Sequence, residues 1–274
     1  MSKIYISAPN LTLVEIPINK FPGGEVRVKV PSNLKNEEYV HIKAFITDSD
    51  GIMGLVMVTD ALRNAGANKI RLTLPYVPYG RQDRVCSEGE SFSLKMFANI
   101  INSLNFSSII LWDSHSDVTR KLIHNTIELN QVDLMSSHVK MVEYMKEAKY
   151  IPTYLVAPDK GSMRKVERIL LQYKELAGLI IGDKVRDMTT GKIIKYEMFD
   201  VPEKSKLENS RVLIVDDLCD GGRTFIEIAK VIENHGKPKE MTLFVTHGIF
   251  SAGMDVFNPY FDNVWSYYQF NDYK

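Results

Sequence analysis

The sequence is short of cysteine, of net charge and of long hydrophobic runs. Its 274 residues include two cysteines, Cys86 and Cys219, with no CxxC motif, so we expect neither a disulfide framework nor a zinc site, and a reducing cytoplasm fits. Lys plus Arg and Asp plus Glu both number 34, so no global field steers the protein to nucleic acid or to an anionic membrane. No apolar run approaches the roughly 18 residues of a membrane-spanning helix, and the N-terminus shows no signal-peptide core.

What the sequence does contain is an alternation of β-rich and helical segments. Apolar residues make up 45% of the chain, which predicts a globular protein with a substantial core. The expected strands are Val26–Val30, Val40–Phe45, Ile70–Leu74, Ser108–Trp112, Tyr154–Ala157, Gly178–Ile181, Arg211–Val215 and Met241–Thr246. The expected helices are Gly51–Ala65, ending at a C′ glycine, Ser93–Leu104, Ser136–Ala148, Gly161–Leu176 and Thr224–Asn234. Continuous apolar strands between helices indicate doubly wound α/β layers with both faces of a parallel sheet covered.

The length allows two such domains. We place the boundary near Val132–Ser136, which gives an N-terminal domain of residues 1–134 and a C-terminal domain of residues 135–274. Within the second, the Gly- and Lys-rich stretch Asp183–Lys206 is expected to be an exposed loop or hairpin, because long loops in compact domains are usually functional.

The strongest motif follows the strand Arg211–Val215. Two adjacent acids, Asp216 and Asp217, stand where the strand ends, and the sequence Asp-Gly-Gly-Arg-Thr follows at 220–224. Ligands bind beyond the carboxyl ends of parallel strands, and adjacent carboxylates need a polar or cationic partner there, such as a sugar diol or magnesium. Glycines and a helix N-terminus suit a phosphate. We also expect a capping box between Thr224 and Glu227; the simpler alternative is an acidic turn that caps a strand.

This loop resembles the phosphoribosyl-binding motif of type I phosphoribosyltransferases and ribose-phosphate pyrophosphokinases. A second segment, Pro-Tyr-Val-Pro-Tyr-Gly-Arg-Gln-Asp-Arg at 75–84, is similar to one found in the pyrophosphokinases. Phe-Pro-Gly-Gly-Glu at 21–25 resembles that family's adenine-binding loop, and Asp48–Met53 stands at the position of a helix start in the family. The resemblance implies that ATP is bound by Phe21, Glu25, Arg81, Gln82 and Asp83.

Three further short matches complete the resemblance. Asp113-Ser114-His115 and Pro158-Asp159-Lys160-Gly161 are similar to family segments that serve magnesium, and Asp183-Lys184-Val185-Arg186 is similar to the family's catalytic Lys-x-Arg loop. The resemblance thus implies catalytic roles for Lys184, Arg186 and His115, and magnesium at His115, Asp159 and Asp216. It implies two tandem phosphoribosyltransferase-type, Rossmann-like domains, the first binding ATP and the second ribose phosphate, in a homodimer or higher homo-oligomer.

The match fails at the phosphate loop. The family's Asp-Thr-x-Gly-Thr is here Asp220-Gly221-Gly222-Arg223-Thr224, so one hydroxyl is missing and an arginine is added. A hydrogen bond to a charged group contributes about 1.5–3 kcal/mol. Arg223 is able to replace the lost hydrogen bond from the threonine hydroxyl to the phosphate, or to reach a second phosphate. We therefore hypothesise an acceptor larger than ribose 5-phosphate, such as ADP-ribose, which would link the protein to NAD metabolism as well as to nucleotide biosynthesis.

Two other functions stay open at this point. A phosphoribosyltransferase proper would use the diol loop but would need no ATP-binding segment. A catalytically silent homologue that regulates an active pyrophosphokinase would be expected to lose the residues at 115, 159, 184 and 186, all of which are present.

Overall fold

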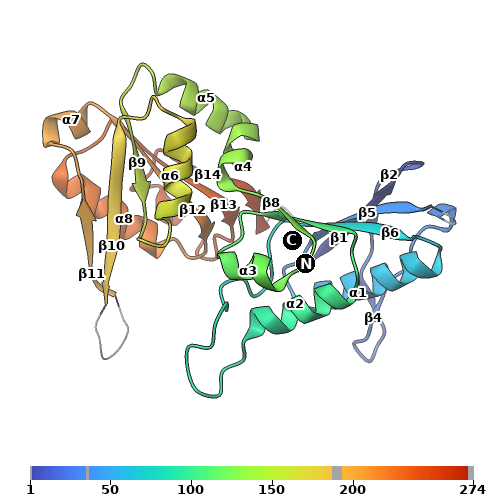
Figure 1. Cartoon of the computed structure of the whole chain (residues 1–274). Coiled ribbons are helices and arrows are strands. Elements are labelled where there is room, and N and C mark those ends of the chain that lie inside the picture. The colour runs from blue at the N-terminus through green and yellow to red at the C-terminus, as the bar shows by residue number, and fades with distance from the viewer. Residues whose placement is uncertain (1, 35–36, 187–192, 271–274) are drawn as a thin grey trace. The chain divides into compact units, whose positions relative to one another are not determined.

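The computed structural model describes residues 2–34, 37–186 and 193–270, except for the side chains of residues 184–186 and 193–195. It divides into two compact units: one comprises Met1–Asn130 with the end of the chain from Phe270, and the other comprises Gln131–Gln269. Both are α/β units with mainly parallel sheets (Figure 1), as predicted. Phe270 packs edge-on against Tyr76 at 5.0 Å between ring centroids, which explains why it groups with the first unit.

The first unit is built on a six-stranded sheet in the order β2-β1-β5-β6-β7-β8. The strands of this unit are β1 Lys3–Ala8, β2 Leu11–Ile16, β3 Asn19–Lys20, β4 Val26–Arg27, β5 Tyr39–Phe45, β6 Lys69–Leu74, β7 Ser108–Trp112 and β8 Thr126–Leu129. Its helices are α1 Ser49–Asn64, α2 Ser93–Ser103, α3 Asp117–Leu122 and the 3-10 turn η1 Ser32–Leu34. Strands β5 to β8 run parallel, whereas β1 is antiparallel to both of its neighbours.

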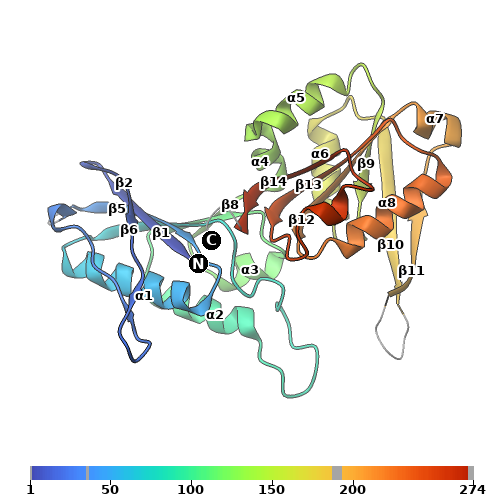
Figure 2. The same ribbon diagram turned by 180° about the vertical axis from the view of Figure 1, so that it is seen from behind.

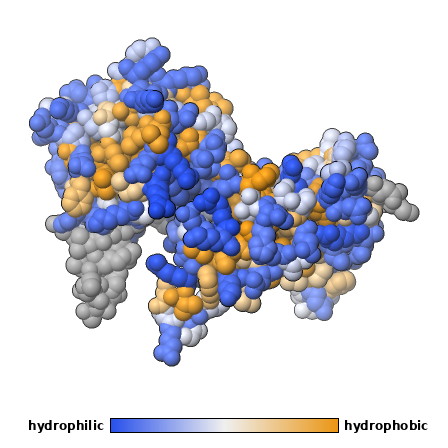
Figure 3. All heavy atoms as spheres, in the orientation of Figure 1, coloured by the Kyte–Doolittle hydropathy of each residue, from blue (hydrophilic) through white to orange (hydrophobic). Residues whose placement is uncertain are grey.

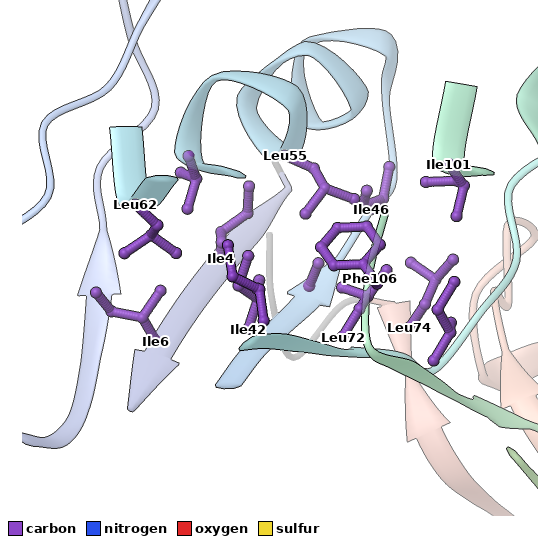
Figure 4. Close-up of a cluster of buried hydrophobic side chains, with 14 of the residues drawn as sticks. Ile4, Ile6, Ile42, Ile46, Leu55, Leu62, Leu72, Leu74, Ile101 and Phe106 are labelled. Carbon is purple, nitrogen blue, oxygen red and sulfur yellow. The ribbon is translucent and has the colours of Figure 1, made fainter. Parts of the chain in front are cut away.

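Apolar side chains on one face of this sheet form a core with α1 and α2. Ile4, Ile42 and Leu72 from three neighbouring strands pack under Leu55 and Ile101 of the helices (Figure 4). In β7 the residues that alternate with the buried ones lie on the other face and are half-exposed. The expectation from the continuous apolar run Ile-Ile-Leu-Trp that this strand is covered on both faces is therefore wrong for β7, because its residues alternate between a buried and a half-exposed face.

The second unit has helices on both faces of its sheet, as Figures 1 and 2 show from opposite sides. The strand order is β11-β10-β9-β12-β13-β14, parallel except for the β10–β11 hairpin. The strands are β9 Thr153–Ala157, β10 Gly178–Arg186, β11 Ile193–Phe199, β12 Arg211–Cys219, β13 Glu240–Gly248 and β14 Asn263–Gln269. The helices are α4 Gln131–Ser137, α5 Val139–Glu147, α6 Met163–Gln172, α7 Lys204–Glu208, α8 Arg223–His235 and the 3-10 turn η2 Asp255–Phe257.

Two separate cores lie on the two faces of this second sheet. Alternate residues of β12 point to opposite sides, so that Leu213 packs with α4, α5 and α6 while Ile214 packs with α8. The central strand is therefore buried on both faces over Arg211–Val215, which confirms the prediction made from its continuous apolar run.

Of three expected features, two differ in the structure and one is confirmed. The strand expected at Val26–Val30 is reduced to Val26–Arg27, because these residues pair only with β3 in a two-stranded ribbon outside the main sheet. The helix expected at Ser136–Ala148 is two helices, because the chain is extended at His138, whose Nδ1 accepts a hydrogen bond from the Met141 amide and caps α5. The expected C′ glycine is confirmed: Gly66 has a φ of 102° after α1.

No helix in the described ranges is long and apolar enough to cross a bilayer. On the face drawn in Figure 3, hydrophobic and hydrophilic residues are interspersed over both units.

A buried arginine ties the start of β12 to the helical layer, and its loss should destabilise the second unit. Arg211 is 1% exposed and donates to Glu147 Oε2 at 2.8 Å and to the Tyr144 carbonyl at 2.9 Å. Arg211→Met keeps the apolar stem but leaves a buried acceptor unpaired, so we expect a loss of about 2–4 kcal/mol in urea unfolding. Arg168→Met, at an exposed site on α6, is the control; a loss below about 1 kcal/mol at Arg211 would contradict this account.

Candidate functional site

Four acids gather at one edge of the second sheet. Because β9, β10 and β12 run parallel, their carboxyl ends lie at the same edge. Asp159 follows β9, Asp183 lies in β10 two residues beyond the last pair with β9, and Asp216 and Asp217 lie near the end of β12. The topology thus brings together acidic residues that are up to 58 positions apart in the sequence.

The adjacent acids of β12 interact directly. The Asp217 amide donates to Asp216 Oδ1 at 2.9 Å, and Lys165 Nζ of α6 lies 3.5 Å from Asp217 Oδ1. Burial and the neighbouring charge of Asp217 raise the pKa of the Asp216 carboxyl well above its usual value, while Lys165 opposes the rise. Lys165 offsets part of the repulsion, so this pair favours a ligand that donates hydrogen bonds or carries positive charge.

Gln131 fixes the backbone where these acids stand. Its side-chain amide donates to the carbonyl of Asp216 and lies 3.5 Å from Thr246 Oγ1 in β13. Gln131 and Lys165 were both missed in the sequence, because each reaches the site from a helix whose pattern indicates only helix.

The expected phosphate loop, residues 220–224, leads directly into α8. Gly222 is the N-cap with a φ of 79°, and a Cβ built on it would lie 2.4 Å from the Phe257 ring, so only glycine fits. The predicted capping box is wrong: α8 begins at Arg223, no side chain caps it, and Glu227 pairs with Lys230 at 3.0 Å instead. The first turn of α8 therefore keeps backbone N–H groups for a ligand.

Gly221 leaves open space beside a serine from the next loop. Within 4 Å of a Cβ built on Gly221, the structure places only the Ser251 hydroxyl oxygen, at 3.6 Å. This hydroxyl donates to Asp220 Oδ1 at 2.6 Å, and the Ser251 amide donates to the Asp220 carbonyl at 3.2 Å. A hydroxyl thus lies near the position where the resemblance led us to expect a threonine, and only the fold could reveal it.

The loop after β9 is held by its own aspartate. Asp159 Oδ1 accepts hydrogen bonds from the amides of Gly161 at 2.9 Å and Ser162 at 3.1 Å. Lys160 Nζ lies 2.6 Å from Asp183 Oδ2 and ties this loop to β10. Backbone pairing in β10 places Lys184 opposite Tyr196, but the side chains of Lys184 and Arg186 lie outside the described part of the structure.

Two predicted segments of the first unit lie close together. In the segment 75–84, the amides of Gly80 and Gln82 donate to the carbonyls of Val77 and Tyr79, forming two successive turns. A Cβ built on Gly80 would lie 3.9 Å from the Cβ of His115. Arg81, Gln82 and His115 are exposed at this position, and Asp83 is half-exposed.

The remaining predicted ATP-binding residues lie in a separate turn. The Phe21 amide donates to the Glu25 carbonyl at 2.9 Å, and the Arg27 guanidinium lies 5.6 Å from the centre of the Phe21 ring. Phe21 is 49% exposed, so part of its side chain is accessible for stacking. The helix start expected at Asp48 is confirmed, because its side chain accepts from the Gly51 amide at 2.9 Å.

The described residues contain no group of three or more His, Cys, Asp or Glu side chains placed to hold a metal ion. They therefore do not form a complete protein cage. Mg²⁺ is commonly held by one or two carboxylates, with water and phosphate as its other ligands. Asp216, with its raised pKa and adjacent Asp217, fits that kind of site.

Comparisons with known proteins identify similar domains in both units. Residues 3–104 match the N-terminal domain of ribose phosphate pyrophosphokinase, and residues 136–255 match the phosphoribosyl transferase domain. Ribose-phosphate pyrophosphokinases of Thermococcus kodakarensis and Sulfurisphaera tokodaii are each 29% identical to the chain, over 88% and 91% of it respectively and 80% of each relative. A phosphoribosylpyrophosphate synthetase structure from Mycobacterium smegmatis has the same fold, with a TM-score of 0.71 and 19% identity over 87% of this chain and 74% of that one.

The raised pKa of Asp216 predicts a pH-dependent stability. Because the folded pKa lies above the unfolded one, stability is fully present below the unfolded pKa and falls as the pH rises through the folded pKa. Asp216→Asn should therefore be more stable than the wild type at neutral pH and converge with it in acid, as measured by urea unfolding against pH. Asp200→Asn, at an exposed position, is the control; a neutral-pH loss of stability in Asp216→Asn would contradict the assignment.

Proposed function

Since the chain belongs to the ribose-phosphate pyrophosphokinase family, we propose that it is an ATP-dependent diphosphokinase. In this reaction the anomeric hydroxyl of a 5-phosphoribosyl sugar attacks the β-phosphorus of ATP. The bond from that phosphorus to the α,β-bridging oxygen breaks, AMP leaves, and the hydroxyl proton is lost to solvent. The observation that carries the proposal is the juxtaposition of the Asp216–Asp217 pair with the glycine loop that opens α8.

The second unit is proposed to bind the sugar phosphate. Ribose hydroxyls donate hydrogen bonds to the carboxylates of Asp216 and Asp217, which replaces part of their mutual repulsion with attraction. The 5-phosphate lies against the backbone N–H groups at the start of α8. The residues proposed for this phosphate are Asp220, Gly221, Gly222, Arg223 and Thr224.

The first unit is proposed to bind ATP. The exposed Phe21 ring offers a stacking surface for adenine, and the turns of the segment 75–84 hold the backbone of Arg81 and Gln82. An arginine at that position forks onto phosphate oxygens. Glu25 and Asp83 complete the proposed set.

The transfer step depends on charge neutralisation more than on covalent chemistry. Lys184 and Arg186, two cations carried by the strand that also holds Asp183, are proposed to stabilise charge on the transferring diphosphate. Asp159 and Asp216 are proposed to hold magnesium, and His115 keeps the magnesium role that the resemblance implies. When bound, magnesium neutralises phosphate charge and aligns the phosphate oxygens.

The alternatives are less well supported. A phosphoribosyltransferase proper does not account for a match to the N-terminal domain of the pyrophosphokinases over residues 3–104. A silent regulatory homologue does not account for the presence of Asp159, Lys184 and Arg186. We further propose a cytoplasmic homo-oligomer in which residues 1–134 and 135–274 are the two functional domains.

Lys184→Ala tests the proposed transfer step. Removing a cation that stabilises the transition state typically costs two to three orders of magnitude in turnover, so AMP formation from ATP and ribose 5-phosphate should fall at least about a hundredfold. Lys174→Ala, an exposed lysine after α6, should leave turnover unchanged. A folded Lys184→Ala protein with wild-type turnover would remove this residue from the mechanism.

A larger acceptor, ADP-ribose, is proposed as the second candidate because of the phosphate loop. Gly221 leaves open space where the family motif has a threonine, and Arg223 is an exposed cation in the first turn of α8. A 5′-diphosphate ester carries a second phosphate that an additional arginine can bind.

The choice of acceptor is measurable as a ratio of kcat/KM for ADP-ribose and for ribose 5-phosphate. If the second phosphate contacts Arg223, Arg223→Ala should lower the value for ADP-ribose about tenfold or more, and that for ribose 5-phosphate much less. Lys230→Ala, farther along the same helix, is the control. A wild-type enzyme that uses ribose 5-phosphate far faster than ADP-ribose would exclude the larger acceptor.

A further inference from the structure

Tyr196 of β11 reaches across the hairpin to the acidic edge of the second sheet. Its side chain is 9% exposed and lies over Gly182 of β10. A Cβ built on Gly182 would lie 2.8 Å from the Tyr196 hydroxyl oxygen and 2.5 Å from the carbonyl oxygen of Pro158. Glycine at 182 therefore allows the ring to pack tightly between β10 and the loop that carries Asp159.

The hydroxyl of Tyr196 is buried and has no hydrogen-bond partner among the described residues. A buried hydroxyl without a partner opposes folding, and such groups in native proteins call for an explanation. A phenylalanine would fill the same space without this penalty. The polar atom is thus better explained by a ligand than by the stability of the free protein.

The surroundings of this hydroxyl identify it as a donor. Burial raises the pKa of Tyr196, and the negative charges of Asp159, Asp216 and Asp183 raise it further, so the group stays protonated at neutral pH. Each of these carboxylates already accepts a hydrogen bond elsewhere: Asp159 from the Gly161 and Ser162 amides, Asp183 from Lys160, and Asp216 from the Asp217 amide.

The same surroundings restrict the class of ligand. Three carboxylates repel a bare anionic oxygen. A neutral sugar hydroxyl, in contrast, donates a hydrogen bond to a carboxylate, and the lone pairs of its oxygen remain available to accept a hydrogen bond from Tyr196. A sugar hydroxyl held at Asp216–Asp217 satisfies both requirements.

We propose that Tyr196 is a substrate-binding residue whose hydroxyl donates a hydrogen bond to a ribose hydroxyl oxygen of the acceptor. This inference rests on the proposed function and adds a contact that none of the sequence motifs contains. Because Tyr196 pairs with Lys184 across the hairpin, the contact also joins the sugar to the strands that carry the proposed catalytic cations.

Tyr196→Phe separates this role from a structural one. Without ligand, the variant should melt at the same temperature as the wild type or higher, because the hydroxyl has no partner to lose among the residues that the structure describes. Calorimetry measures the binding of ribose 5-phosphate and of ADP-ribose separately. For the acceptor that the wild type uses, the affinity of the variant should be about three- to tenfold lower, the usual effect of one hydrogen bond. The affinity for ATP with magnesium should not change.

Tyr144→Phe is the matched control. Tyr144 is also a buried tyrosine of this unit, but its ring lies 3.9 Å from the guanidinium of Arg211, at the start of β12 rather than at its end. Its replacement should leave sugar affinity unchanged.

Two results would overturn the inference while the wild type binds sugar normally. One is Tyr196→Phe with wild-type affinity for both acceptors; the other is a lowered melting temperature of the unliganded variant, which would show a structural hydrogen bond. A wild-type protein that binds neither acceptor would instead contradict the proposed function, and this inference with it.

Discussion

The repulsion between carboxylates at one edge of a parallel sheet is the constraint on which the functional interpretation depends. Parallel pairing of β9, β10 and β12 places Asp159, Asp183 and the Asp216–Asp217 pair at the same edge. Lys160 on Asp183 and Lys165 on Asp217 offset part of this charge. The repulsion between these carboxylates lowers the stability of the free protein. A ligand that donates hydrogen bonds or brings positive charge to the carboxylates raises the stability again.

In the proposed function, one edge serves two chemically different parts of a sugar phosphate. Donor hydroxyls of a sugar suit the acidic pair, whereas the phosphate suits the N–H groups that open α8. Gly222, which only glycine fits beside Phe257, sets the turn between these two subsites. Tyr196 adds a neutral donor among the acids, which an extra lysine would not provide without cancelling the charge that attracts the sugar hydroxyls.

Much of this arrangement is predictable from the sequence, because strand, acid pair and glycine loop are contiguous at 211–224 and each has its own pattern. The core strands β5, β6, β7, β9, β12 and β13 were predicted for the same reason. The strands β2 and β14, and the contributions of Lys165 and Ser251, were not, because they depend on pairing register or on packing between distant segments. Tyr196 did carry a signal: it lies in the β-branched and aromatic run Ile193–Phe199, within a stretch interpreted as an exposed loop or hairpin, and the β10–β11 hairpin is found there.

The central claim is that a sugar hydroxyl attacks ATP while the sugar's own carbon–oxygen bond stays intact. Ribose 5-phosphate or ADP-ribose labelled with ¹⁸O at the anomeric hydroxyl tests it directly, by mass analysis of the product formed with ATP and magnesium. The account predicts that the label is retained between the anomeric carbon and the new diphosphate, with unlabelled AMP released. Loss of the label from the sugar, or product formation without AMP, would contradict the account, because the carboxylate edge would then be serving a different reaction.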